Sequence, residues 1–122
     1  MGFFLVTNNP LVGGKYPNLT LDSFDGSLIE LLIRVRNYVH MGHSLLTHPL
    51  SGSLKPGRIP YKTIALSCSK NGLDLLSLQY IENSIEVSRK TALPEPESCS
   101  EETLSDYAVV DLSHLEAALE AL

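Results

Sequence analysis

The hydrophobic and polar positions follow two different periods along the chain, which predicts a mixture of strands and helices. Short apolar or alternating runs, each closed by turn residues, occur over residues 3–7, 19–24, 44–47, 62–67 and 108–112, and each predicts a strand. Helical spacing of apolar residues occurs over 27–41, over 74–91 and after Ser113. Strands that alternate with helices favour one small α/β domain, with a mostly parallel sheet of about five strands flanked by helices.

The predicted helix over 27–41 has the clearest end signals. Ser27 and Glu30 fit a capping box, in which each side chain bonds the backbone N–H of the other residue. Gly42 is well placed to end this helix. The second helix is expected to bury Leu75, Leu78, Ile81 and Ile85, and Ser113 with Glu116 is expected to cap a short final helix.

Polar turn segments follow the predicted strands, where ligands bind in parallel sheets. Asn8 and Asn9 come directly after the first strand and could offer amide groups to a ligand, although turn chemistry explains an asparagine pair equally well. Cys68 lies at the end of another predicted strand, where we expect a buried and unreactive thiol. Cys99 falls in an acidic segment and is expected to be exposed.

The segment between His48 and Pro60 is rich in proline, glycine and serine, and it lacks periodicity. Long connections of this kind are usually functional or disordered. Glycine permits close backbone approach, serine hydroxyls donate hydrogen bonds and cations neutralise charge, so the segment could cradle an anion. A solvated loop built of turn residues is the alternative. The candidate ligand-binding residues here are His48, Ser51, Gly52, Ser53, Lys55 and Arg58.

Length and charge narrow the function. A chain of 122 residues with 43% hydrophobic and 19% charged residues fits one domain over 1–122, within which the acidic, proline-containing stretch 94–106 is expected to be an exposed linker. Residues 1–62 contain six Lys or Arg and three Asp or Glu, a balance of +3, and residues 63–122 contain three and eleven, a balance of −8. This distribution argues against nucleic-acid binding and allows a local anion site in the first half.

A cytoplasmic protein without a membrane segment is expected. The apolar start has no basic flank, no apolar run reaches the roughly 20 residues needed to cross a bilayer, and two cysteines are too few for a disulfide scaffold. The phosphate-binding, nucleophile-elbow and zinc-protease motifs are absent from the sequence, so it shows no self-sufficient catalytic motif and no cofactor is expected.

Three histidines, His40, His43 and His48, fall within nine residues and could bind a metal. Their spacing matches no established zinc pattern and neither cysteine lies nearby, so we expect no metal site. The alternative interpretation places His40 at the negative end of a helix dipole and His43 in a surface turn.

Three segments together resemble the GrdX family: residues 7–12 (TNNPLV), residues 42–56 (GHSLLTHPLSGSLKP) and residues 81–86 (IENSIE). The middle segment is the most specific, residues 60–62 continue it, and residues 93–106 do not contribute. The resemblance implies a gene-neighbourhood association with the selenocysteine- and thioredoxin-dependent glycine, sarcosine or betaine reductase that serves amino-acid fermentation in anaerobic bacteria and yields acetyl phosphate. It implies an accessory factor of unsettled biochemical role, not a catalytic subunit.

Two functional hypotheses follow. The first is a non-catalytic accessory protein. It binds a reductase component, thioredoxin or a small anionic metabolite through residues 47–58. The alternative is a small enzyme acting on an acyl phosphate or related metabolite, with His48 as acid or base and with Lys55 and Arg58 holding the anion. A homodimer formed through an exposed sheet edge or helix is compatible with either hypothesis.

Overall fold

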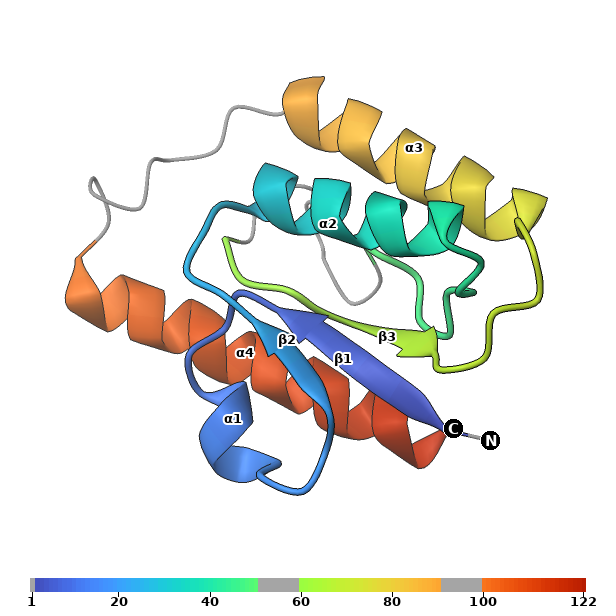
Figure 1. Cartoon of the computed structure of the whole chain (residues 1–122). Helices are drawn as coiled ribbons and strands as arrows, with labels where there is room; N and C mark the ends of the chain where they lie inside the picture. The colour runs from blue at the N-terminus through green and yellow to red at the C-terminus, as the bar shows by residue number, and fades with distance from the viewer. Residues whose placement is uncertain (1, 51–59, 91–99) are drawn as a thin grey trace.

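The structure, a computed structural model, describes residues 2–50, 60–90 and 100–122. Figure 1 shows the elements, which follow one another as β1 (Phe3–Thr7), α1 (Val12–Lys15), β2 (Leu21–Ser23), α2 (Leu28–His40), β3 (Thr63–Ser67), α3 (Leu75–Lys90) and α4 (Glu101–Glu120). The strand predictions over 3–7, 19–24 and 62–67 are thus confirmed in position, as are the helices over 27–41 and 74–91.

The described strands form a three-stranded mixed sheet in the order β2-β1-β3. β1 and β2 are parallel, with Leu5 opposite Leu21, whereas β1 and β3 are antiparallel, with Leu5 opposite Ala65. The expected five-stranded, mostly parallel sheet is therefore wrong, although the α/β class is confirmed. A mostly parallel sheet would have a parallel strand beside β1. In the described part of the chain that position is occupied by the antiparallel strand β3.

Residues 44–47 form a single bridge and not a full strand. Leu45 pairs with Leu66 on the outer edge of β3, and the Leu46 N–H donates to the Ala65 carbonyl at 2.9 Å. At the next position the Thr47 hydroxyl oxygen replaces a backbone acceptor and receives the Ala65 N–H at 3.1 Å. This side-chain contact ends the ladder after one bridge.

Residues 108–112 were predicted to form a strand and instead lie in the middle of α4. Ala108, Asp111 and Leu115 are buried at helical spacing, whereas Val109 and Val110 are exposed. A five-residue apolar run fits either period, and here the helical period wins because it directs one stripe onto the sheet. The helix also begins earlier than predicted: Ser100 accepts a hydrogen bond from the Thr103 N–H, so Ser113 is not its cap.

The predicted linker 94–106 divides at this cap. Residues 94–99 lie outside the described part of the chain, and residues 101–106 form the first turns of α4.

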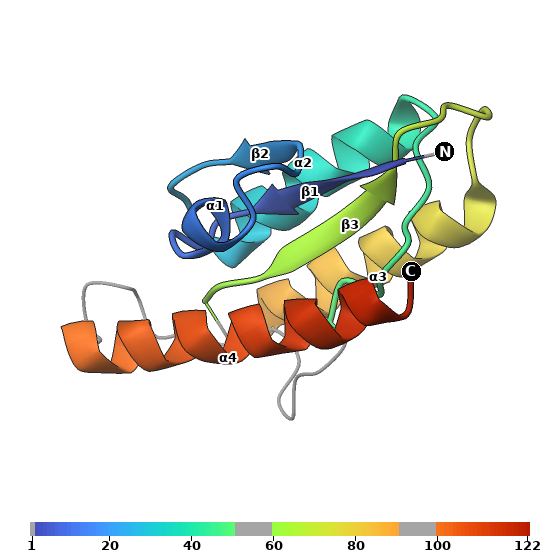
Figure 2. The ribbon, with the colours of Figure 1, turned by 90° about the horizontal axis from the view of Figure 1, so that it is seen from below.

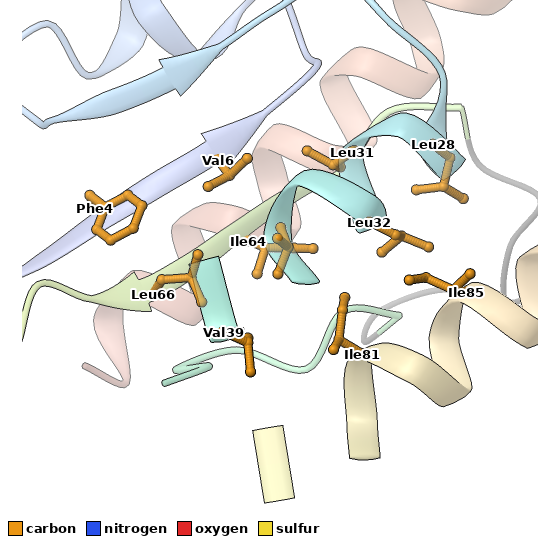
Figure 3. Close-up of a cluster of buried hydrophobic side chains, with 11 residues drawn as sticks. Phe4, Val6, Leu28, Leu31, Leu32, Val39, Ile64, Leu66, Ile81 and Ile85 are labelled. Atoms are coloured by element: carbon orange, nitrogen blue, oxygen red, sulfur yellow. The ribbon is translucent and has the colours of Figure 1, made fainter. Parts of the chain in front are cut away.

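Each face of the sheet has its own hydrophobic cluster, because alternate residues of a strand point to opposite faces. α2 and α3 cover one face, and the larger cluster beneath them includes Phe4, Val6, Ile64 and Leu66 from the sheet (Figure 3). α4 crosses the other face, where Leu115 packs with Leu5 and Ala65 (Figure 2).

The capping box of α2 is confirmed, since Ser27 accepts from the Glu30 N–H at 3.1 Å and Glu30 accepts from the Ser27 N–H at 3.3 Å. Gly42 follows the helix with a φ of 108°, a backbone conformation that favours glycine.

α3 buries a different set of residues from the one expected. Ile81 and Ile85 are buried as predicted, but Leu78 is only partly buried and Leu75 is exposed. The remaining buried positions on this helix are Ser77, Ser84 and Ser88. In the part of the chain that the structure describes, no helix combines the length and apolar character that a membrane span requires.

Candidate functional site

Four buried polar residues meet where β1 ends, β3 begins and α4 crosses the sheet. We call Thr7, Asn9, Thr63 and Asp111 the Asp111 cluster; each is at most 5% exposed. The Asp111 carboxylate accepts from the Thr63 hydroxyl at 2.8 Å, from the Thr63 N–H at 3.2 Å and from Asn9 Nδ2 at 2.9 Å. The Thr7 and Thr63 hydroxyls lie 2.8 Å apart. These bonds compensate for the burial of the carboxylate and fix α4 to the strand ends.

Asn9 shapes the turn that follows β1. Its side-chain oxygen accepts from the Leu11 N–H at 3.0 Å, and its own N–H donates to the Thr7 hydroxyl at 2.9 Å. Asparagine favours such turns because its short amide can replace a backbone partner two residues away. Its Nδ2 group also donates to the Ala108 carbonyl at 2.9 Å, so the turn and α4 are joined through one side chain.

Asn8 ties together three segments that are distant in sequence. Its Nδ2 group donates to the Gly26 carbonyl at 3.0 Å and to the Pro60 carbonyl at 2.8 Å, and its oxygen accepts from the Lys62 N–H at 2.9 Å. In the structure, the amides of Asn8 and Asn9 are therefore bonded within the protein. Their predicted role in ligand binding stays a prediction.

Lys62 lies next to the Asp111 cluster. Burial lowers the pKa of its ammonium group, and the nearby Asp111 carboxylate opposes that shift. The residue therefore places a partly desolvated cation just after the 47–58 loop.

His48 begins the predicted loop at the surface of α3. Its Nδ1 atom accepts from the Leu50 N–H at 3.1 Å, and its ring lies 5.1 Å from the Tyr80 ring at an angle of 57°. The other predicted loop residues, Ser51, Gly52, Ser53, Lys55 and Arg58, lie outside the described part of the chain. The convergence of His48 with Lys55 and Arg58 stays a prediction.

His43 is not the surface turn residue that we expected. It is 7% exposed, its Nδ1 atom lies 2.7 Å from the Ser67 carbonyl oxygen, and its ring meets the edges of the Phe4 and Tyr38 rings at 5.1 and 5.6 Å. The residues that the structure describes contain no group of three or more His, Cys, Asp or Glu arranged to hold a metal ion.

The expectation for Cys68 is also wrong, because its side chain is exposed and not buried. Cys99 lies outside the described residues.

Sequence reasoning missed most of the Asp111 cluster. Asp111 gave a usable signal, because a carboxylate inside an apolar run needs buried partners if that run packs on a sheet. Thr7, Thr63 and Lys62 gave none, since threonine is common in strands and lysine is usually exposed.

In the comparison with protein families, the model of the GrdX-like protein matches residues 4–120. No curated protein and no solved structure matches the chain. The matched range includes all three segments on which the resemblance rests and nearly every described residue. The chain therefore belongs to the GrdX-like protein family.

Proposed function

We propose that this protein is an accessory binding protein of the glycine, sarcosine or betaine reductase system. Membership of the GrdX-like family implies an association with the glycine reductase system. The proposed binding element is the 47–58 loop, and its target is a reductase component, thioredoxin or a small anionic metabolite.

One observation carries the choice of this loop: side chains of the fold hold the chain on both sides of it. On one side, the Thr47 hydroxyl accepts from the Ala65 N–H in β3. On the other side, Asn8 bonds both the Pro60 carbonyl and the Lys62 N–H. Binding residues are often carried on loops whose ends are positioned by a rigid scaffold.

Charge supports an anionic target. Lys55 and Arg58 are the two cations of the loop, and Lys62 follows it as a third. The first half of the chain carries a surplus of positive charge although the whole chain carries −5. A positively charged loop on an acidic protein attracts an anionic group or an acidic protein surface. It also repels such partners less strongly than a protein surface that is acidic throughout.

The test is direct binding between the purified chain and each purified reductase component or thioredoxin, measured by surface plasmon resonance. We expect at least one of them to bind the wild type and the double variant Lys55→Glu/Arg58→Glu to bind it at least about tenfold more weakly. The control is Arg89→Glu/Lys90→Glu, which makes the same change of charge at the end of α3 and should bind within about twofold of the wild type.

Binding by none of these proteins would refute the docking form of the proposal. Calorimetric titration with acetyl phosphate and with inorganic phosphate then tests the anion form. Equal weakening in both double variants would show a general charge effect and would remove the 47–58 loop from the proposal.

A further inference from the structure

Several large apolar side chains are exposed at the start of α3 and in the turn before it. Leu73, Leu75 and Leu76 are 50, 72 and 55% exposed, and Met41 at the end of α2 is 54% exposed. We call these four residues the leucine patch. Single exposed leucines are ordinary, but several together usually mark an interaction surface.

The four residues lie at one end of the molecule. The Asn71 N–H donates to the Gly42 carbonyl at 3.2 Å, which joins the turn before α3 to the end of α2. Figure 1 shows the C-terminal end of α2 beside the N-terminal end of α3. Tyr80, one helical turn after Leu76 and 40% exposed, borders the patch and carries the ring contact with His48.

Among the described residues, neither hydrophobic cluster includes this side of α3. α3 contacts α2, and Ile81 and Ile85 share a hydrophobic cluster with α2, against which Leu78 packs partly buried. The other buried positions of α3 are Ser77, Ser84 and Ser88. Leu76 and Tyr80 are four residues apart and lie outside that buried stripe. The leucines therefore contribute exposed apolar area without contributing to the core of the single chain.

The charges beside the patch fit a second copy of the same surface. Lys70 and Asp74 flank Leu73 with opposite signs and so leave the patch locally neutral. Asp74 keeps its charge, because a hydrogen bond from Ser77 lowers the pKa of its carboxyl group. α4, by contrast, contains six Asp or Glu and no Lys or Arg, so two copies would repel each other there.

We propose that the leucine patch is the interface of a symmetric homodimer. In a two-fold interface each residue meets the reciprocal surface of the other copy, so Lys70 of each chain pairs with Asp74 of the other around a leucine centre. Because Tyr80 borders the patch, the dimer brings the His48 ends of both 47–58 loops near the interface. The leucine patch shares no residue with the 47–58 loop, so the dimer does not depend on the proposed function.

Sedimentation velocity of the purified chain over about 1 to 200 µM, a range that brackets a micromolar Kd, tests the proposal. We expect a species of twice the 13.4 kDa chain mass at high concentration. The variant Leu76→Asp should raise the dimer Kd about a hundredfold, because each interface loses two central apolar contacts and gains two buried charges. Lys70→Glu should raise the Kd about tenfold through the two lost pairs.

Val109→Asp is the matched control, since Val109 is 52% exposed on α4 and the same charge is introduced there. It should leave the dimer Kd within about twofold of the wild type. Circular dichroism on each variant checks that the fold is kept, and Leu75→Asp serves as a second patch variant if Leu76→Asp unfolds.

A wild-type chain that stays monomeric at all concentrations overturns the proposal. A dimer that survives both leucine variants, or that Val109→Asp dissociates, places the interface elsewhere and overturns it as well.

Discussion

Replacing Asp111 with alanine removes the acceptor on which three buried hydrogen bonds of the Asp111 cluster converge. The carboxylate is 3% exposed and receives the Thr63 N–H, the Thr63 hydroxyl and one Asn9 N–H. The Thr63 hydroxyl can turn toward the Thr7 oxygen 2.8 Å away, and Asn9 keeps its second bond, to the Ala108 carbonyl. Two donors then remain buried without an acceptor: the Thr63 N–H and one hydrogen of the Asn9 amide.

Each buried donor left unsatisfied costs about 1–3 kcal/mol. Removing the carboxylate also removes the cost of burying it, which offsets part of this loss. We therefore expect Asp111→Ala to lower the free energy of unfolding by about 3 kcal/mol, which for a domain of this size lowers the Tm by roughly 10 °C. Asp111→Asn should fall between alanine and the wild type, because an amide keeps one acceptor but turns an NH2 group toward a donor.

Urea and thermal denaturation, followed by circular dichroism, measure these differences. The control is Asp106→Ala, an exposed carboxylate on the same helix, which should change the free energy of unfolding by no more than about 0.5 kcal/mol. If Asp111→Ala melts within about 2 °C of Asp106→Ala, a difference below about 1 kcal/mol, the cluster does not hold α4 to the sheet and the reasoning fails.

Three further predictions test other parts of the fold. His43→Ala should lower the free energy of unfolding, measured by urea denaturation, by about 2–4 kcal/mol, because it removes a buried ring and its contact with Ser67. The control His48→Ala, at an exposed position, should lower it by less than about 1 kcal/mol. Equal losses would contradict the assignment of His43 to the core. Ser27→Ala should cost about 1 kcal/mol by removing the cap of α2, and no change in the urea midpoint would argue against the capping box. Burial lowers the pKa of Lys62 below its ordinary 10.5, so between the lowered pKa and pH 10.5 the unfolded chain binds more protons than the folded chain and stability rises with pH. Melting curves across this pH range should show the wild type gaining stability relative to Lys62→Met. Parallel profiles for the two proteins would refute the lowered pKa of Lys62.

Sequence reasoning was most accurate for elements that carry clear local signals, such as helix caps and turn residues. The capping box at Ser27 and Glu30 and the glycine at position 42 gave both ends of α2 to within a residue. β1 was equally readable, because a short apolar run closed by Asn-Asn-Pro is a buried strand and its turn. In α2 the capping interactions lie within four residues in sequence, whereas in β1 only the apolar run and its closing turn are local and the strand pairing is not.

The errors occurred where a short pattern was compatible with two structures. The run at 108–112 fits a strand or a helix, and packing of Ala108, Asp111 and Leu115 against the sheet chose the helix. Leu75 has the spacing of a core residue, but α3 turns its serine-containing face to α2 and leaves that leucine outside.

In the candidate site, too, local features could be predicted from the sequence and long-range contacts could not. The sequence indicated the 47–58 loop through its turn residues and cations, and the asparagine pair through its position after β1. It could not show that Asn8 bonds the backbone at Pro60 and Lys62, since those partners are more than 50 residues away.

By itself, then, the sequence determined the α/β class, the positions of three strands and two helices, and the family, because these depend on local period, caps and motif order. Only the tertiary structure decided the direction of β3, the length of α4, the burial of His43 and the Asp111 cluster. Each of these depends on contacts between segments far apart in the chain, and free energy is gained there only when both partners are brought together.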